Sequence, residues 1–477
     1  MAPGPTANPN PAALDRPQAS SGSAHGAAAA PATRATAAPG SGGPLLAGIG
    51  VIAAAAVVAG AVARRSTGPA DKTLAAASTA VLAATPRRRF YTGGDLDRAV
   101  TIEDLRAMAH RRLPRFALEY LEGGAEDEAA LAHNVAAFAE WRFRHRSLVD
   151  VSHCDLSTGL FGRPMAMPVA IAPTGLNALF WPHADLHLAE AAAEMGVPFA
   201  QSTMSNEAMA RVARVPGLRY WWQLYVFGRP QVRETLMRRA LDAGCEALIL
   251  TVDAQIYGNR EWHARTQSDA KTLTWSSKLD ALRHPRWLAS GLLRHGLPRF
   301  ENVIDFVPRD RRRFFDSAHW IRSQMDRALS WDMAAGIRER WPRKLIIKGL
   351  LDVADVVRAA EIGADGVVLS NHGGRQLDWA AAPLEVLPPA REAVGDRIAI
   401  LVDGGIRRGT DVIKAVALGA DAVMCGRAAL YGVAAAGRAG ARRALEILRS
   451  ELDRDLGLLG VPAIAGLNPA LLARAGR

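Results

Sequence analysis

Eight short apolar runs rich in β-branched residues alternate with longer helical stretches from about residue 165 onward. Runs of this length suit fully buried parallel strands, and the segments between them have the length of crossover helices. Eight such units in succession predict an α/β chain folded as a (β/α)8 TIM barrel. The predicted strands cover residues 168–174, 197–202, 219–226, 247–253, 344–350, 366–371, 398–404 and 422–427.

Polar residues and glycines gather where the predicted strands end. In a (β/α)8 barrel the C-terminal ends of the strands share one rim, and that rim carries the active site. Chance would spread such residues over both rims, so their distribution favours a catalytic barrel. The residues in question are Thr174, Ser202, Gln223, Tyr225, Thr251, Asp253, Lys348, His372, Arg375, Asp403, Gly405, Arg407, Gly426 and Arg427.

Two strand ends carry dense motifs, SNHGGRQLD at 370–378 and DGGIRRGTD at 403–411. The first presents a histidine and an arginine, and the second presents glycines and arginines suited to a phosphate. A histidine near an arginine is by itself more often structural, and a pair of arginines is usually a solvated surface. Two such motifs at consecutive strand ends indicate an active site.

About 90 residues separate Asp253 from Lys344, and only 330–342 has the pattern of the expected helix, which leaves a long insertion after the fourth strand. The insertion combines large apolar residues with many arginines, a mixture expected of a surface that meets a membrane interface. A packed subdomain with solvated arginines is the alternative. The large apolar residues are Trp275, Trp287, Leu288, Leu292, Leu293, Phe314 and Phe315.

The N-terminal region has a different composition. Residues 1–44 consist mainly of Ala, Pro, Gly, Ser and Thr, which predicts a disordered tail. Residues 45–63 are uncharged and almost long enough to span a bilayer, and positive charge follows them, so we expect an anchor that leaves the barrel on the cytoplasmic face. An Ala/Gly-rich low-complexity tail is the alternative. Residues 64–97 then form a linker, and 98–470 form the barrel domain.

The net charge of +11 is unevenly placed, because residues 1–89 hold eight basic and two acidic residues and so account for +6 of it. The barrel is only mildly basic and carries no nucleic-acid-binding motif, which argues against a nucleic-acid partner. The three cysteines, Cys154, Cys245 and Cys425, lack metal-ligand spacing, so we expect reduced, buried thiols and no metal site.

The motifs at 370–378 and 403–411 resemble the signatures of the FMN-dependent α-hydroxy acid dehydrogenase and oxidase family. The resemblance runs from about Ile102 to about Leu467. Within the family, the chain is most similar to the subgroup of mandelate and flavin-dependent lactate dehydrogenases. It implies FMN as cofactor, a small 2-hydroxy acid as substrate and a tetrameric assembly. Its further motifs are LEYLEGGAED (118–127), IAPTG (171–175), QLYV (223–226), TVD (251–253), IKGL (347–350) and GR (426–427).

The resemblance also implies roles in substrate oxidation. Arg375 and Arg260 match the ligands of the substrate carboxylate, a task that suits the guanidinium fork. Tyr120 matches a further donor to that carboxylate, and Tyr225 a contact to the substrate hydroxyl. His372 matches the general base, and Asp253 the carboxylate that orients it.

For the cofactor, Lys348 matches the lysine beside the flavin N1 and C2 carbonyl, where an ammonium stabilises negative charge. Ser202, Gln223 and Thr251 match positions that hydrogen-bond the edge of the ring, and residues 172–174 match the segment alongside it. The phosphate is expected near Asp403, between the side chains of Arg407 and Arg427 and the backbone N–H groups of Gly405 and Gly426.

The acceptor of the electrons is less constrained. Gly175 follows Ala-Pro-Thr where many oxidases of the family have alanine, which favours a dehydrogenase that uses a quinone-type acceptor. An oxidase that uses O2 is the runner-up. Met204 stands where some members have a tryptophan near the substrate, so the size of the substrate stays open. Two readings from other classes are another phosphate-binding barrel flavoenzyme and a non-catalytic, membrane-tethered binding module; neither requires the set His372, Arg375, Asp253 and Tyr225.

Overall fold

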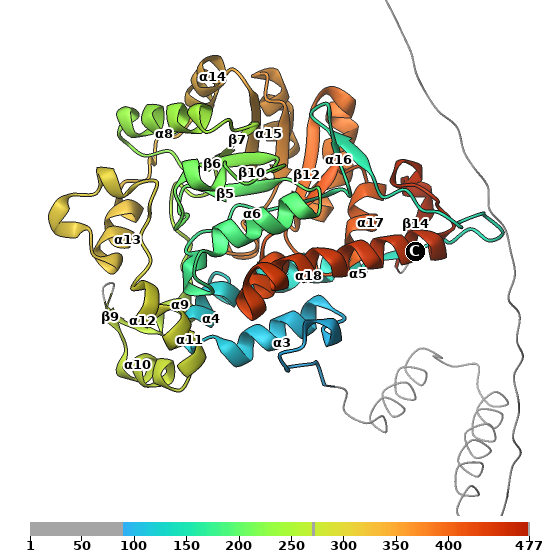
Figure 1. Ribbon diagram of the computed structural model, residues 1–477. Helices are drawn as coiled ribbons and strands as arrows, with labels where there is room; N and C mark the ends of the chain where they lie inside the picture. Colours follow the sequence, from blue (N-terminus) through green and yellow to red (C-terminus); the bar gives the residue numbers. More distant parts are fainter. Residues whose placement is uncertain (1–88, 270–271, 476–477) are drawn as a thin grey trace, which may run out of the picture. The chain divides into compact units, whose positions relative to one another are not determined.

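Eight parallel strands close into a barrel in the computed structural model, which describes residues 89–269 and 272–475 (Figure 1). Their spatial order follows the chain, and the eighth strand pairs with the first. The (β/α)8 fold predicted from the sequence is confirmed. The strands are β4 (Val169–Ile171), β5 (Phe199–Ser202), β6 (Tyr220–Leu224), β7 (Ala247–Thr251), β10 (Lys344–Leu350), β11 (Gly366–Leu369), β12 (Ala399–Asp403) and β13 (Ala422–Cys425).

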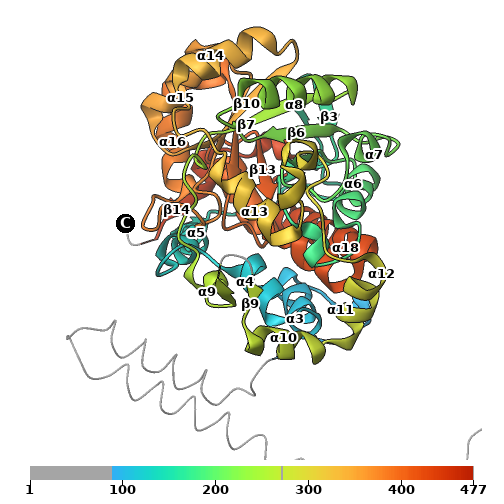
Figure 2. The same cartoon turned by 90° about the vertical axis from the view of Figure 1, so that its left-hand side faces the viewer.

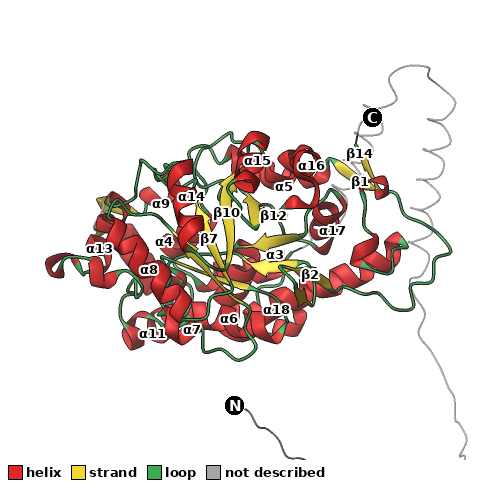
Figure 3. Cartoon of the chain, turned by 90° about the horizontal axis from the view of Figure 1, so that it is seen from above, coloured by secondary structure: helices red, strands yellow, loops and turns green. Residues whose placement is uncertain are grey.

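A helix follows each strand and covers the outside of the barrel (Figure 3). The predicted helix at 330–342 is present as α14, which begins at Trp331 after a side-chain cap from Ser330. The last helix bends sharply, because the backbone of Ala436 and Gly437 is not helical. The helices are α6 (Ala184–Glu194), α7 (Met209–Val212), α8 (Pro230–Asp242), α14 (Trp331–Arg340), α15 (Val353–Glu361), α16 (Pro383–Val394), α17 (Gly409–Ala417) and α18 (Arg427–Leu459).

The barrel interior is a packed core. Alternate strand residues such as Ile249, Ile346 and Val368 form one buried cluster, while their neighbours pack outward against the helices. The hairpin of β2 (Thr158–Leu160) and β3 (Arg163–Met165) packs on this cluster at the N-terminal ends of the strands. The hairpin closes the N-terminal end of the barrel, so a pocket inside the barrel can open at the C-terminal ends of the strands.

Within the described residues, three α-helices precede the barrel: α3 (Ile102–Arg112), α4 (Arg115–Glu122) and α5 (Ala129–Ala139). Thr101 and Asp104 form a capping box that starts α3, and α3 packs along α18. Near the C-terminus, β14 (Leu472–Arg474) pairs with β1 (Trp141–Phe143). This extension brings the C-terminal end of α4 to the catalytic rim.

The long insertion after β7 is folded rather than structureless. It contains α9 (Glu261–Ala264), β8 (Gln267–Asp269), β9 (Thr272–Leu273), α10 (Trp275–Leu282), α11 (Pro285–Ser290), α12 (Leu292–His295) and α13 (Phe314–Ser323). Helices α10 to α12 lie together beside α3 and α4 (Figures 1 and 2). The insertion is anchored by Trp287, whose indole N–H donates to the Leu179 carbonyl at 2.7 Å.

The three cysteines are free, with Cys245 and Cys425 buried and Cys154 half-buried. Among the described residues no helix combines the length and the apolar character needed to cross a membrane. The predicted tail at 1–44, the predicted anchor at 45–63 and most of the predicted linker lie outside the residues that the structure describes.

Candidate active site

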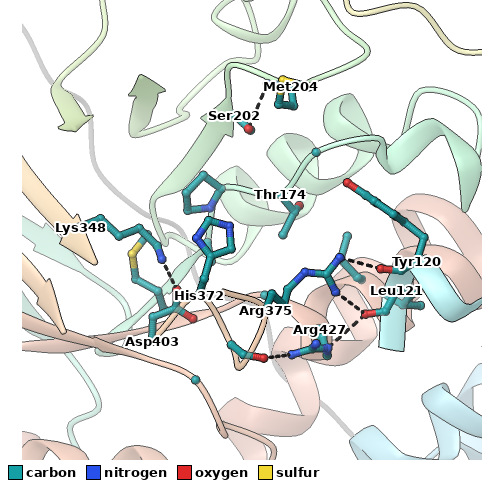
Figure 4. Close-up of a pocket in the computed structure, with 18 of the residues that line it drawn as sticks. Tyr120, Leu121, Thr174, Ser202, Met204, Lys348, His372, Arg375, Asp403 and Arg427 are labelled. Atoms are coloured by element: carbon teal, nitrogen blue, oxygen red, sulfur yellow. Dashed lines mark hydrogen bonds and ion pairs between the residues drawn. The ribbon is translucent and has the colours of Figure 1, made fainter. Parts of the chain in front are cut away.

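A pocket opens at the C-terminal rim of the barrel, between the strand ends and the end of α4 (Figure 4). Thirteen of the predicted site residues line it, and the other three lie directly against those that do. Gln223 accepts a hydrogen bond from Ser202, Thr251 pairs in register with Lys348, and Asp253 contacts His372. The thirteen are Tyr120, Thr174, Ser202, Tyr225, Arg260, Lys348, His372, Arg375, Asp403, Gly405, Arg407, Gly426 and Arg427.

His372 is held in one orientation by hydrogen bonds to both of its ring nitrogens. Its Nδ1 lies 3.0 Å from Asp253 Oδ1, and its Nε2 lies 3.4 Å from the Tyr225 hydroxyl. Because Nδ1 donates its hydrogen to the carboxylate, Nε2 keeps a lone pair that faces the pocket. Gly349 makes room for this arrangement: its φ is +107°, and a Cβ there would lie 2.6 Å from Asp253 Cγ. An imidazole oriented by a carboxylate in this way is able to accept a proton from a group in the pocket.

The protonation states match that role. Burial lowers the pKa of His372 below its ordinary value, although the charge of Asp253 partly opposes the shift. Burial would raise the pKa of Asp253, but its interactions with His372, including the hydrogen bond from the ring, and with the Lys348 ammonium outweigh burial and the net shift is downward. At neutral pH the imidazole is therefore neutral and able to accept a proton, while the carboxylate is ionised.

Lys348 forms the second polar group at the base of the pocket. Its Nζ lies 2.7 Å from Asp403 Oδ2 and donates to Ser370 Oγ at 2.8 Å, and both charged side chains are buried. Ser370 Oγ in turn accepts the backbone N–H of His372 at 2.9 Å. The network fixes the ammonium and links it to the loop that carries the base.

Four arginines line the pocket, and none of them forms an ion pair with a carboxylate of the described residues: Arg260, Arg375, Arg407 and Arg427. The one carboxylate that lines the pocket, Asp403, pairs with Lys348. Burial, together with the neighbouring arginines, lowers the pKa of Arg375. Arg260 is buried and the other three are half-buried, so positive charge of this density in one pocket favours anionic ligands.

The arginines differ in how many donors they have left. Arg427 donates to the carbonyls of Leu121, Glu122, Gly123 and Gly373, so it mainly holds the end of α4 against the 370–378 loop. Arg375 donates to Leu121 and Gly123 through Nη1 and to Tyr120 through Nη2, which leaves its Nε–H and one Nη2 hydrogen without a partner among the described residues. Arg260 makes one long bond of 3.4 Å, from Nε to the Arg375 carbonyl. Arg407 likewise makes a single bond, from Nη1 to the Ile406 carbonyl. All three of Arg260, Arg375 and Arg407 therefore keep donors that an anion in the pocket can accept.

The side chains expected to contact a flavin fit that group. Three of them carry a buried polar atom with no hydrogen-bond partner among the described residues: Thr174 Oγ1, Gln223 Nε2 and Thr251 Oγ1. Buried polar atoms are rarely left unpaired, and a ring edge rich in nitrogen and oxygen would pair them. Next to them, Gly405 has φ +81°, and a Cβ there would lie 2.1 Å from the Asn134 carbonyl. Only glycine allows the backbone of the 403–411 loop to turn this closely past Asn134.

Some residues of the site were not predicted from the sequence. Asn134 of α5 and Asn371 exchange two buried amide hydrogen bonds at 2.7 and 2.8 Å, which hold the 370–378 loop to the extension. Asp378 accepts the backbone N–H groups of Asp127 and Ala130 and so caps the start of α5. Tyr257 lines the pocket beneath Arg260, with 5.5 Å between the guanidinium and the ring centroid. The motifs flagged Asn371 and Asp378, but no sequence signal pointed to Asn134 or Tyr257.

Comparisons with known proteins identify relatives that span most of the described chain. The model of the FMN-dependent dehydrogenase family matches residues 109–474. The (S)-mandelate dehydrogenase of Pseudomonas putida is 42% identical over 377 residues, which cover 79% of this chain and 94% of that protein. The L-lactate dehydrogenase of Caulobacter sp. (strain K31) is 38% identical over 375 residues, 78% of this chain and 98% of that protein. A crystal structure of monotopic membrane protein (S)-mandelate dehydrogenase aligns with a TM-score of 0.75 and 41% identity over 79% of this chain and 99% of that one.

Proposed function

The chain belongs to the FMN-dependent dehydrogenase family, and from that membership we propose that it oxidises an L-2-hydroxy acid of the mandelate or lactate type to the 2-oxo acid, with His372 as the base. Membership itself makes the chain an FMN-dependent oxidoreductase that acts on hydroxy acids. One observation carries the finer proposal: a neutral, carboxylate-oriented imidazole lies in a pocket lined by four arginines without ion-pair partners. A substrate that carries both a carboxylate and an adjacent hydroxyl satisfies both halves of this site.

The substrate would bind through its carboxylate to Arg375 and Arg260, with Tyr120 beside them. Its hydroxyl would lie between Tyr225 and His372, whose Nε2 takes the proton as the carbonyl forms. The ionised Asp253 stabilises the imidazolium that results. The oxidation removes two electrons and two protons from the substrate, and FMN, when bound, accepts the electrons.

The other predicted residues would hold the cofactor. Arg407 and the backbone N–H groups of Gly405 and Gly426 would take its phosphate, with Arg427 behind them. Lys348, held by Asp403, would lie where negative charge accumulates. Thr174, Ser202, Gln223 and Thr251 would pair with the ring edge.

The side chain of the substrate would enter a small cavity that adjoins the main pocket and whose lining, apart from His263, Gln267, His319 and Arg322, is apolar or aromatic. Leu176, Leu179, Met204 and Tyr257 line this cavity, and Tyr120 and Met204 also face the main pocket. An apolar wall of this kind favours a phenyl or branched group over the methyl group of lactate. The proposal is tested by supplying the (S) and (R) forms of mandelate and lactate with a soluble dye as acceptor and measuring the 2-oxo acid. Oxidation of the (S) forms alone supports it, and hydrogen peroxide formed as fast as the dye is reduced would favour the oxidase reading.

Acid should inhibit the enzyme only below the ordinary titration range of histidine. The base must be neutral to accept a proton, and burial lowers the pKa of His372, so the active form persists as the pH falls below about 6.5 and is lost on protonation at a lower value. The measurement is the pH dependence of kcat/KM, which reports the free enzyme. An acidic limb with its midpoint above the ordinary histidine value would contradict the assignment.

Association with a membrane surface is proposed through the insertion. Trp275, Leu279 and Leu282 of α10 are 78%, 57% and 64% exposed and follow one face of the helix, and Leu293 of α12 is 74% exposed. The same part of the insertion carries four exposed arginines, as expected for contact with anionic lipid: Arg283, Arg286, Arg294 and Arg299. The mandelate dehydrogenase structure described as monotopic supports this reading.

Charge placed on this face should weaken vesicle binding. In a chain from which 45–63 has been deleted, the double variant Leu279→Asp/Leu282→Asp should bind anionic vesicles at least about tenfold more weakly. Burying the two leucine side chains in the bilayer contributes roughly 3 kcal/mol, which the variant loses. Leu458→Asp, on an exposed leucine of α18, is the control and should bind as before. Equal co-sedimentation of all three proteins would exclude this face.

Four further points of the sequence analysis stay proposals. The tail at 1–44, the anchor at 45–63 and the linker at 64–97 would place the domain at 98–470 on the cytoplasmic face of a membrane. The family resemblance supports a homotetramer, and a lipid-soluble quinone fits an enzyme held at that surface. Sedimentation in detergent would test the homotetramer, and fractionation of cells expressing the chain with and without 45–63 would test the anchor.

A further inference from the structure

A second cavity of about 440 Å³ lies next to the active site, between the insertion and the segment that follows β4. None of the predicted site residues lines it. Its walls are mainly apolar and aromatic, and its volume is that of a small-molecule site. Among the lining residues are Leu179, Trp181, Leu273, Trp287, Leu288 and Phe314.

Aromatic side chains alone separate this cavity from the active site at one point. Phe180 lines both spaces, and its ring stacks on that of Tyr120 with 6.2 Å between the centroids. The small cavity that adjoins the main pocket lies next to both, because it shares Tyr120 and Met204 with the active site and Phe116 with the large cavity. A ligand in the large cavity would therefore lie next to the active-site pocket without blocking the substrate.

The opposite end of the cavity opens toward the proposed membrane face. Leu282 and Leu297 line the cavity and are 64% and 52% exposed. Leu282 belongs to the same face of α10 as Trp275 and Leu279. A ligand with an apolar tail could enter directly from a bilayer, with its tail remaining at this mouth.

Arg112 provides a polar group within the apolar lining. It stacks on Trp181 at 4.0 Å, and it donates to the Phe180 carbonyl at 2.7 Å and to Ser290 Oγ at 3.0 Å. It forms no ion pair with any carboxylate of the described residues. Burial lowers the pKa of Arg112 to about 10, which keeps it charged near neutral pH. A cation held beside stacked aromatic rings suits a planar ligand that bears carbonyl oxygens.

We propose that this cavity binds the ring of a lipid-soluble quinone, with Arg112 donating to a ring carbonyl and the tail leaving past Leu282 and Leu297. The inference rests on the proposed function, in which hydroxy acid oxidation requires a second substrate to take the electrons. The quinone gains two electrons and two protons and becomes the quinol, which balances the two electrons and two protons that the hydroxy acid loses. The hydroxy acid would then enter the pocket at the barrel rim, and the quinone would enter the second cavity past Leu282 and Leu297.

The test fills the cavity at a point distant from the active site. Ala281 of α10 lines the cavity, whereas Ala289 of α11 is exposed and does not, so Ala281→Trp and Ala289→Trp form a matched pair that each add one tryptophan. In detergent, binding of a benzoquinone with a decyl tail to each holoenzyme variant is measured by the quenching of tryptophan fluorescence. They are also compared for flavin reduction by the hydroxy acid and for reoxidation by that quinone or by a soluble dye.

Ala281→Trp should weaken quinone binding and slow reoxidation by quinone at least about tenfold. Its reduction by substrate and its reoxidation by dye should stay as in the parent. Ala289→Trp should match the parent in all four measurements. Arg112→Met should weaken quinone binding, and Arg112→Lys should restore part of it. Equal binding and reoxidation in the parent and Ala281→Trp would overturn the proposal, as would displacement of the quinone by decanoate at equal concentration, which would indicate a fatty acid site. If no hydroxy acid reduces the flavin, the proposed function fails, and dithionite-reduced enzyme still tests the cavity.

Discussion

Replacing His372 with asparagine should lower kcat by about 10⁴-fold, the upper end of what a general base contributes. His372 is the only histidine among the described residues that line the pocket. Its ring contacts the carboxylate of Asp253 at Nδ1 and the hydroxyl of Tyr225 at Nε2. Asparagine keeps a polar group of similar reach but cannot accept the proton. Stopped-flow measurement of anaerobic flavin reduction isolates this step.

The flavin content and melting temperature of His372→Asn should match those of the parent, because the backbone N–H of residue 372, rather than its ring, bonds to Ser370. Asp253→Asn should show a smaller loss, since it leaves the imidazole in place but removes its orientation. Flavin reduction in His372→Asn at more than a tenth of the parent rate would assign the base elsewhere.

Replacing Arg375 with methionine should lower kcat/KM for the hydroxy acid by about 10³-fold. Loss of a charge-assisted pair with the substrate carboxylate costs roughly 4 kcal/mol when both oxygens lose a donor. Arg375 also holds the carbonyls of Tyr120 and Gly123, so part of the effect could come from a displaced α4. The readout therefore compares the acid with its methyl ester, which has no carboxylate to lose.

The ratio of kcat/KM for acid over ester should fall in Arg375→Met and fall again when Arg260→Met is added. Arg260→Met alone is the cleaner variant structurally, because its single bond to the protein is long. Arg375→Lys keeps the charge but not the fork and should recover only part of the selectivity. An unchanged acid-to-ester ratio in both arginine variants would place the carboxylate site elsewhere.

The barrel could be predicted because strands buried on both faces leave continuous apolar runs in the sequence. Several predicted strands extend beyond the observed ones at the rim, as at 168–174, where β4 ends at Ile171. Residues past that point leave the ladder to line the pocket, and their apolar character does not reveal the change. The clustering of the polar residues followed from topology alone, since parallel strands bring their C-terminal ends together.

The parts that escaped prediction depend on contacts between distant segments. Arg427 occupies the predicted pocket, but its guanidinium bonds to the carbonyls at the end of α4, which strand position alone does not indicate. In the insertion, composition did not distinguish buried Trp287 from exposed Trp275, because the helices are too short for a clear periodicity. The second cavity likewise arises where the insertion meets the segment after β4.

Anaerobic titration of the visible spectrum of the purified protein with (S)-mandelate and L-lactate tests the central claim most directly. The account predicts an oxidised-flavin spectrum that at least one of the two bleaches, and a colour that returns faster with a quinone than with air. A yellow protein that no 2-hydroxy acid bleaches, or a colourless protein that FMN does not reconstitute, would contradict it.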